Sequence, residues 1–498
     1  MPSGLITSPG PGNFGQGFRV QAGMDDSVVA WARTEFGHCC LGDERRSARL
    51  LQMAAAAASR PSGTITGTFK LAADREGAFR FVENDDIDPS AIGAAVYEAA
   101  AKRSATERVI VVPVDETSLC LRDPEGQRGF GPVGSYHRMA TGIQVMSALA
   151  VKRDGSTIGL LDQEWWVRGW GRIRRPKGGS KADPRPPEER ETYYWVRTLR
   201  AAAARMSQHA PGCIPWFQLD RGGDCRAVFE FAQDERIALT VRAKTDRRLH
   251  FRDGKIGYLY AALDARPLAG YYEVAVPARP GQRARTARLA VRFLAAPIAL
   301  PLSKKRRRVV TVHAVLAREV DPPVGQEAIR WVLLTSRRVG NLVDALQIVS
   351  AYTLRWRIED FHKVWKSGAC DIEGSQLRRR DHFQRWATIM AAVAARIERI
   401  KHLSRTEPTR PATDEFTQDE IDALILLRSE GTTVPYEVGD VPSLGEATRW
   451  IADLGGYMGS RNSPPPGSKV LRRGLEQVTA AAAAVRALRV THGRSGQS

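Results

Sequence analysis

Hydrophobic residues recur at a helical spacing in the first part of the chain, and this spacing predicts an all-helical N-terminal domain. In SVVAWARTEF, Val28, Trp31 and Phe36 fall on one side of a helix. The segment SARLLQMAAAAASR follows and consists largely of strong helix formers. We therefore expect a helical domain at residues 25–105, preceded by a flexible tail rich in Gly, Pro and Ser at residues 1–24.

At Arg108 the pattern changes to short apolar runs, which are RVIVVPVDETSL, IQVMSALAV, CIPWFQLDRGGD and RIALTVRAK. A segment with helical spacing, ETYYWVRTLRAAAARM, separates the second run from the third. Strands that alternate with helices indicate an α/β core. At about residues 246–330, short strands follow one another across Pro, Gly and basic turns without helices, which predicts an antiparallel β insertion.

The chain becomes helical again from Asn341 to about Leu403, and residues 404–498 end in the Ala-rich segment LEQVTAAAAAVRALRV. The predicted fold class is therefore α/β, with a core domain at residues 106–403 between N-terminal and C-terminal all-helical regions. The segment 168–190 is rich in Gly, Pro and charge, and it predicts a loop.

The amino-acid composition indicates which kinds of partner and site the protein can have. The 498 residues include 74 Lys and Arg against 55 Asp and Glu, a formal charge of +19 that favours a polyanion. No apolar run is long enough to span a bilayer, and we expect a cytoplasmic protein without a membrane partner. The six cysteines form no CxxC pair, which argues against a zinc module and a disulfide framework.

Two carboxylates follow apolar strands directly. Asp115 comes after VIVVPV and Asp220 after WFQL, where an α/β sheet presents its carboxyl edge to ligands. Taken alone, each is more often a turn former or a helix cap. Glu116 should point to the opposite face of a continuing strand and is excluded. Asp224, four residues after Asp220, is either a supporting partner or a helix cap.

A third carboxylate, Glu359, lies in YTLRWRIEDFHKVWK. At about 100° per residue, a single helix through this segment would bring a phenol, a carboxylate and three cations to one face. Those residues are Tyr352, Arg355, Glu359, Lys363 and Lys366. Such a stripe is usually a solvated face.

An apolar surface on the same helix changes that interpretation. Trp356, Ile358, Phe361 and Trp365 would allow the helix to pack while its polar face looks into a cleft. Three converging carboxylates can hold two Mg²⁺ ions about 3.5–4 Å apart for phosphoryl transfer. His362 lies at the edge of the same face, where it could contact phosphate.

These motifs resemble a known family. Tyr352, Arg355, Glu359 and Lys366 match the Y-x2-R-x3-E-x6-K signature of cut-and-paste DDE transposases of the insertion-sequence-four class. VDETSL and LDRGGD resemble the two Asp motifs of that family, and they occur in the same order. WARTEFGHCCLGDERRSARL and AFRFVEN resemble its end-binding domain, and LTVRAK, RWVLLTS and LGGYMGSR match further blocks.

The resemblance implies a ribonuclease-H-like catalytic core in which Asp115, Asp220 and Glu359 hold two Mg²⁺ ions, for which Mn²⁺ can substitute. It implies backbone DNA contacts from Tyr352, Arg355 and Lys366, to which the helix face adds Lys363. Arg242 and Lys244 of VRAK occupy family DNA-contact positions. Charge that protects an edge strand is the alternative for this pair.

Three further features also indicate contacts with DNA. Trp331, in the RWVLLTS block, corresponds to a residue that receives a flipped base during hairpin formation, and a core position is its alternative. In the N-terminal region, the basic helix with Arg45, Arg46 and Arg49 is expected to recognise the element end. KKRRR at 304–308 is interpreted as a phosphate-contact patch, with a nuclear import signal as the alternative.

The expected function is that of a bacterial, nucleoid-associated transposase. It would bind double-stranded DNA at the element ends, cut it through a hairpin intermediate and join it to target DNA as a homodimer. The C-terminal helical region would form the dimer contact. The alternatives are a ribonuclease-H-like DNA nuclease without strand transfer, and a catalytically silent DNA-binding inhibitor of transposition.

Overall fold

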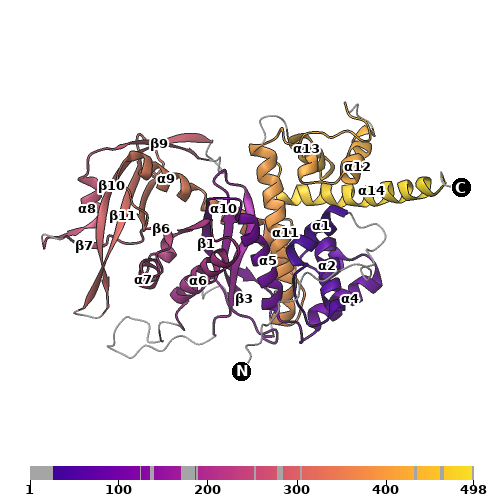
Figure 1. The fold of residues 1–498 in the computed structure, drawn as a ribbon, viewed down its shortest axis with the longest axis horizontal. Coiled ribbons are helices and arrows are strands. Elements are labelled where there is room, and N and C mark those ends of the chain that lie inside the picture. Colours follow the sequence, from indigo (N-terminus) through magenta and orange to yellow (C-terminus); the bar gives the residue numbers. More distant parts are fainter. Residues whose placement is uncertain are drawn as a thin grey trace, which may run out of the picture.

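The computed structural model of the chain describes residues 26–495 apart from 124, 135–139, 170–185, 187–188, 252–253, 277–283, 303–305, 431–434 and 460–464. The tail expected at residues 1–24, nearly all of the loop around 171–187 and the first two residues of KKRRR lie outside these ranges. The described residues form a mixed α/β structure, with one large sheet and helices at both ends of the chain (Figure 1).

A twelve-stranded mixed sheet forms the centre of the described structure. Its strands are β1 (Val109–Cys120), β2 (Gly131–Pro132), β3 (Thr141–Val151), β4 (Thr157–Trp166), β5 (Ile214–Leu219), β6 (Ala238–Arg242), β7 (Arg248–His250), β8 (Ile256–Tyr258), β9 (Gly270–Val276), β10 (Arg285–Pro301), β11 (Arg307–Glu319) and β12 (Arg330–Thr335). The order along the sheet is β2-β3-β1-β5-β6-β12-β11-β10-β7-β8, with β4 on β3 and β9 on β10. The pairs β1·β5 and β5·β6 are parallel, and the others are antiparallel.

The strands expected as a β insertion do pair in an antiparallel manner, but they extend the core sheet because β12 pairs with β6. Two details of that expectation are wrong. A helix, α8 (Leu259–Asp264), stands between β8 and β9, and β10 is a strand of 17 residues. β10 and β11 pair from Leu289 with Glu319 to Pro301 with Arg307, which makes them one long hairpin.

Helices cover both faces of this sheet and form its flanks. The N-terminal helices are α1 (Asp26–Phe36), α2 (Glu44–Ser59), α3 (Ile65–Thr68), α4 (Ala72–Glu83) and α5 (Pro89–Ser104). Those of the core are α6 (Glu191–His209), α7 (Arg226–Asp234), α9 (Leu342–Thr353), α10 (Trp356–Lys366) and α11 (Arg380–Thr406). The C-terminal helices are α12 (Gln418–Ser429), α13 (Leu444–Leu454) and α14 (Ser468–Ser495).

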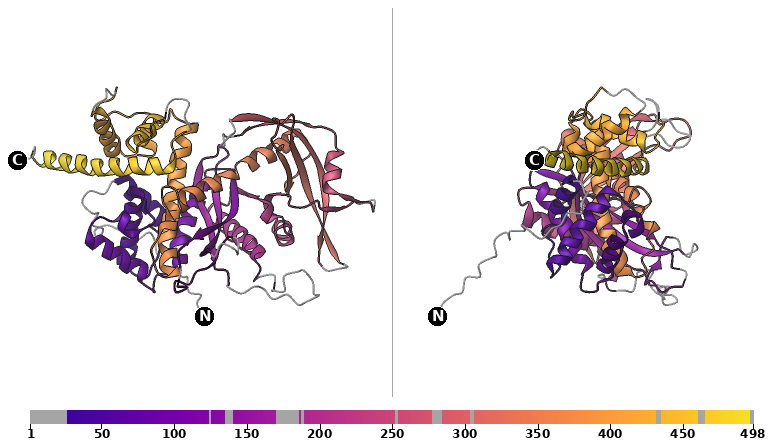
Figure 2. Two further views of the ribbon diagram at one scale, coloured as in Figure 1. Left: turned by 180° about the vertical axis from the view of Figure 1, so that it is seen from behind. Right: turned by 90° about the vertical axis from the view of Figure 1, so that its right-hand side faces the viewer.

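The long helix α11 joins the parts of the molecule. It stands between the sheet and the two groups of flanking helices, as Figure 1 and the rear view in Figure 2 both show. One apolar core contains Phe36 and Leu50 of the N-terminal helices together with Trp365 and Trp386 of α10 and α11. The last turns of α11 pack into a separate core with α12, α13 and α14. The N-terminal helices therefore share their core with the sheet domain.

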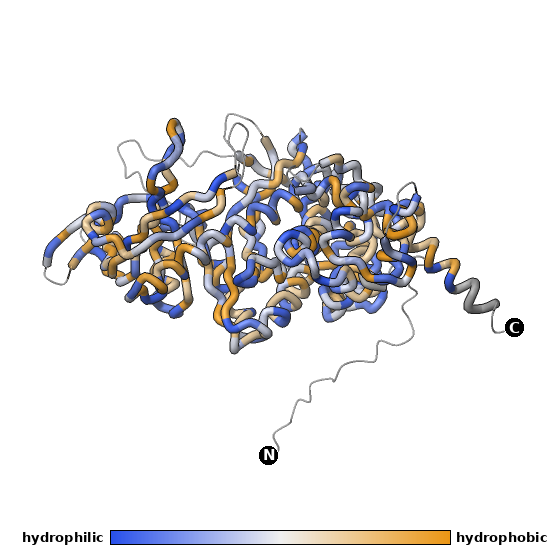
Figure 3. The backbone as a smooth tube through the Cα atoms, turned by 90° about the horizontal axis from the view of Figure 1, so that it is seen from above, coloured by the Kyte–Doolittle hydropathy of each residue, from blue (hydrophilic) through white to orange (hydrophobic). Residues whose placement is uncertain are grey.

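Hydrophobic and hydrophilic residues alternate along most of the backbone in Figure 3. In the part of the chain that the structure describes, no helix has the length and apolar character that a membrane crossing requires.

The junction between α11 and the N-terminal helices gives a test of this packing. Arg385 is 2% exposed and donates to the carbonyls of Val82 and Ile87, at 2.6 Å each. Arg385→Met should lower the free energy of unfolding by roughly 2–5 kcal/mol, because it leaves two buried carbonyls unpaired. Chemical denaturation followed by Trp fluorescence measures this change.

The matched control is Arg379→Ala, at the start of the same helix. Arg379 pairs with Asp85 in a solvent-exposed contact of 3.2 Å, and its loss should cost about 1 kcal/mol or less. Equal destabilisation by the two variants would contradict the proposed role of Arg385.

Candidate active site

Asp115 and Asp220 lie side by side where the parallel pairing of β1 with β5 ends. The last partners are Val114 and Leu219, so the next residue on each strand is an aspartate. The expectation that Asp115 ends its strand is wrong, because β1 continues to Cys120 by antiparallel pairing with β3. Asp115 thus lies at the position where β1 extends past the end of its pairing with β5 and stays paired with β3.

The continued strand places the side chain of Glu116 on the face of the sheet opposite to that of Asp115. Successive residues of a strand point to opposite faces. Glu116 forms an ion pair with Arg168 at 3.0 Å, and Arg168 also contacts Glu191 at the start of α6. This ion pair holds Glu116 on the α6 side of the sheet.

Asp220 also caps a short helix. Its carboxylate accepts a 2.6 Å hydrogen bond from the amide of Gly222, in the 3₁₀ helix η3 (Arg221–Gly223). Asp224 has a different role, because its side chain is fully buried and accepts from the Lys244 amide at 2.6 Å and from Arg247 Nε at 2.7 Å. Its carboxylate therefore supports the segment after β6, whereas its backbone amide caps the end of η3.

Glu359 comes from the first turn of α10, which packs across β1 and β3. The expectation of one helix from Tyr352 to Lys366 is wrong, since α9 ends at Thr353 and α10 begins at Trp356. At the junction, the amides of Leu354 and Arg355 donate to the carbonyls of Ala351 and Tyr352, three residues back. These tighter turns interrupt the helix and separate Tyr352 from Glu359.

Arg355 lies between two of the three carboxylates. Its Nη1 is 3.2 Å from Oδ2 of Asp115, and its Nη2 is 2.7 Å from Oε1 of Glu359. The Arg355 side chain is 8% exposed. Burial opposes the guanidinium charge, but Tyr352, Asp115 and Glu359 raise the pKa of Arg355 above its ordinary value.

The three carboxylates interact electrostatically. Burial, together with the negative charges of Asp220 and Glu359, raises the pKa of Asp115 to about 7, against the opposing effects of Arg355 and of the Glu116 amide. Mutual repulsion of this kind is what a divalent cation would relieve, and carboxylate oxygens are the donors that Mg²⁺ prefers. The type of donor therefore fits the expected ions.

The geometry does not yet form a binding site. Within the described ranges, no three His, Cys, Asp or Glu side chains converge closely enough to hold a metal ion. One oxygen of Asp115 and one of Glu359 face the guanidinium of Arg355, and the other oxygen of Asp115 accepts from the Glu116 amide at 2.9 Å.

Several of the expected DNA-contact residues surround the carboxylates. Lys363 is exposed, and Lys366 is half-buried with its Nζ 3.2 Å from Oγ1 of Thr117 on β1. Lys244 is exposed after β6, and Arg242 is half-buried and donates to the carbonyl of Arg330 at 3.3 Å. The structure thus brings these cations to the same edge of the sheet as Asp220.

The aromatic residues differ from expectation. Tyr352 is 2% exposed, and Trp331 on β12 is half-buried with its ring edge-to-face on Tyr352, 5.7 Å between centroids. Trp356, expected on the apolar surface, is 46% exposed beside Arg355 because it is the first residue of α10. His362 is buried, and burial together with Lys366 lowers its pKa to about 3. A buried neutral imidazole does not favour the expected phosphate contact of His362.

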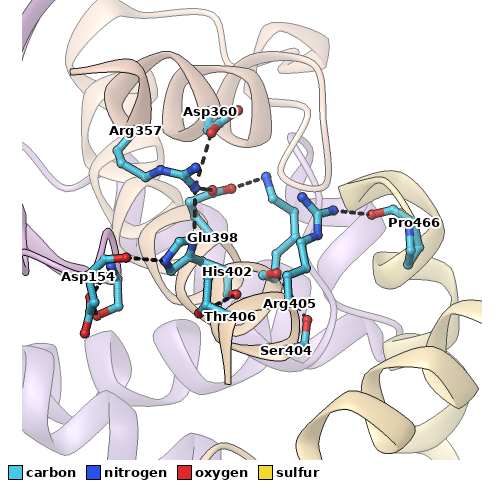
Figure 4. A network of polar contacts seen from close by, with 11 residues as sticks. Asp154, Arg357, Asp360, Glu398, His402, Ser404, Arg405, Thr406 and Pro466 are labelled. Carbon is cyan, nitrogen blue, oxygen red and sulfur yellow. Dashed lines mark hydrogen bonds and ion pairs between the residues drawn. The ribbon is translucent and has the colours of Figure 1, made fainter. Parts of the chain in front are cut away.

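A polar network on the far side of α10 anchors the helix and was not predicted from the sequence (Figure 4). Arg357 Nη1 is 3.4 Å from Asp360, 3.4 Å from the fully buried Glu398 and 3.2 Å from Nδ1 of His402. His402 Nε2 donates to the carbonyl of Asp154, in the turn between β3 and β4, at 3.1 Å. The two partners of Arg357 on α11 are 41 and 45 residues away, so no local sequence signal could reveal them.

In the N-terminal region, α2 carries the expected basic residues. The Arg45 side chain is 92% exposed and pairs with the N-cap residue Asp43 at 3.1 Å. Arg46 contacts Asp86 at 2.5 Å and the Leu41 carbonyl at 3.3 Å. Arg49 is half-buried beside Gly77 of α4. Arg45 is the most accessible of the three to a partner.

Two regions of the chain match models of known protein families. Residues 29–87 match the family model for transposase DNA-binding, a range that contains the basic residues of α2. Residues 199–395 match the model for the transposase DDE domain, a range that contains Asp220 and Glu359, whereas Asp115 lies outside both matches. The chain thus carries a transposase DNA-binding domain and a transposase DDE domain, which supports its identification as a DDE transposase.

Proposed function

We propose that this chain is a cut-and-paste transposase of the insertion-sequence-four class with a ribonuclease-H-like core. It binds the ends of its mobile element, cleaves them through a hairpin intermediate and joins them to target DNA. The observation that carries the proposal is that Asp115 and Asp220, at the end of β1·β5 pairing, and Glu359, on a helix packed across β1, lie near enough for the charges of Asp220 and Glu359 to act on Asp115.

The residues have separate tasks in this reaction. Asp115, Asp220 and Glu359 would hold two Mg²⁺ ions, or Mn²⁺, which activate the attacking oxygen and stabilise the leaving oxygen when bound. Arg355 and Tyr352 hold the phosphodiester next to the cut, because a guanidinium pairs well with phosphate. The cations Arg242, Lys244, Lys363 and Lys366 bind the adjoining backbone.

The N-terminal helices would select the element end, with double-stranded DNA as the partner. Arg45 reaches outward from α2, and Arg46 and Arg49 stabilise the helix or contact phosphate. We propose a homodimer as the synaptic assembly, with residues 404–498 as the contact. The last turns of α14 lie at one end of the molecule in Figure 1, where a second chain could approach them.

The metal-binding role is tested by Asp115→Ala, Asp220→Ala and Glu359→Ala. The cleavage rate of each variant should fall by at least about a hundredfold. Loss of a residue that hydrogen-bonds a metal ligand typically costs about 10- to 100-fold, and loss of the ligand itself should cost more. Binding of the element-end duplex should change little. Cleavage of labelled end DNA with Mg²⁺ and gel-shift titration measure the two properties.

Glu116→Gln is the matched control, since Glu116 adjoins Asp115 but faces the other side of the sheet. It should cleave at a wild-type rate. Cleavage near the wild-type rate by any of the three alanine variants would remove that residue from the proposed triad, and a silent wild-type protein would favour the inhibitor alternative.

End recognition is tested by the point variant Arg45→Ala. Deletion of residues 1–105 is unsuitable, because it would expose the apolar core that these residues share with α10 and α11. Loss of a base contact should weaken binding to the element end by about 1–3 kcal/mol while binding to random DNA stays the same. Lys102→Ala, at the end of α5, is the control. If Arg45→Ala weakens binding to both DNAs equally, Arg45 contacts phosphate and does not read bases.

Trp331 is proposed to receive the flipped base. Trp331→Ala should nick normally and form hairpins slowly, because stacking on an aromatic ring returns roughly 1–3 kcal/mol per base. The alternative is that Trp331 is a core residue, which its edge-to-face contact with Tyr352 would suit. In that case the thermal stability, the nicking rate and the rate of hairpin formation should fall together. Time courses on labelled end DNA and a melting curve distinguish these outcomes.

A further inference from the structure

Arg355 occupies the position of a counter-ion in the site. It is the one residue for which the structure gives direct contacts to two of the proposed metal ligands, Asp115 and Glu359, among the described residues. It comes from the junction of α9 and α10, where the tight turns fix its backbone. Its side chain therefore spans from the helix junction to β1.

The bridge is incomplete on one side. The Nε of Arg355 is buried without a hydrogen-bond partner. Its guanidinium lies 6.0 Å from the ring centroid of Tyr352 and 4.9 Å from that of Trp356. An unsatisfied buried donor costs free energy, so an additional anionic oxygen would be favourable here.

Positive charge is concentrated beside this group. Burial lowers the pKa of Arg242 against an opposing interaction with Tyr352, and the neighbouring charges of Arg221 and Arg355 lower it further. A phosphodiester that approached Arg242 and Arg355 would relieve this repulsion. It would also offer two oxygens in the geometry that a carboxylate offers, since a guanidinium forms bidentate pairs with both.

We propose that Arg355 changes partners on DNA binding, from the carboxylates of Asp115 and Glu359 to a phosphodiester, and that this exchange permits divalent metal to bind. The inference rests on the proposed function, because it takes the three carboxylates as the metal ligands. In the DNA-free protein the guanidinium compensates the charge of two ligands and holds one oxygen of each toward itself. When a phosphate pairs with the guanidinium of Arg355, the charges of the two carboxylates are no longer compensated, and both side chains can turn toward a metal ion.

The exchange links the two ligands thermodynamically. If bound DNA raises the affinity for metal by some factor, bound metal must raise the affinity for DNA by the same factor. Typical factors for such coupling are about 5- to 150-fold. Cutting would then be restricted to bound DNA, because protein without DNA would hold its metal weakly.

The test uses full-length protein and Mn²⁺ as the probe, with bound ion counted by electron paramagnetic resonance. Without DNA, wild type should bind Mn²⁺ weakly, and Arg355→Ala should bind it roughly tenfold more tightly or more, within the usual range of coupling. Arg355→Gln, which fills the same space without the charge, serves as a second variant if the alanine variant unfolds.

The matched control is Arg242→Ala. Arg242 belongs to the same basic cluster but donates to the carbonyl of Arg330 and not to a carboxylate. It should weaken DNA binding while the Mn²⁺ affinity of the DNA-free protein stays near that of wild type. Addition of a duplex with the element end should raise Mn²⁺ affinity in wild type, and should raise it much less in Arg355→Ala.

Two outcomes distinguish this inference from the proposed function. Equal Mn²⁺ affinities in DNA-free wild type, Arg355→Ala and Arg355→Gln, with binding that Asp220→Ala removes, would overturn the exchange and leave the triad intact. Absence of Mn²⁺ binding in every protein, with and without DNA, would overturn the exchange together with the metal-binding role of the triad.

Discussion

The position of the acidic site depends on where one pairing of strands ends. The parallel pairing of β1 with β5 extends to Val114 and Leu219, and this sets Asp115 and Asp220 at the same level of the sheet. β1 is carried further only by β3. A register shift of one residue between β1 and β5 would move one aspartate to the opposite face, so the hydrophobic packing that fixes register also fixes the site.

Glu359 joins the aspartates because α10 is held from two sides. Toward the sheet, Lys366 reaches Thr117 two residues beyond Asp115. Toward α11, Arg357 is bound by the buried Glu398 and by His402. Both sets of contacts lie within one or two turns of Glu359, so the site combines strand ends fixed by backbone pairing with a helix fixed by side-chain ion pairs.

The parts that could be predicted from sequence are those with a local signal. The β-branched run before Asp115, the helical spacing of Val28, Trp31 and Phe36, and the antiparallel pairing around β10 all follow from patterns within about twenty residues. The break before Trp356 had no such signal, because Leu354 and Arg355 are ordinary helix formers. The bridge from Arg355 to Asp115 spans 240 residues, and burial of His362 depends on packing that no periodicity specifies.

The core shared between the N-terminal helices and α11 has a consequence for synthesis on the ribosome. α5 ends at Ser104 and α11 begins at Arg380, so α2, α4 and α5 lack their contacts with α11 until about 275 more residues have been added. At about 5–20 residues per second, this delay lasts roughly a quarter of a minute to one minute. During that time the faces of the N-terminal helices that pack on α11 stay open to solvent and to chaperones, and the core around Phe36 and Leu50 is complete only when most of the chain has emerged.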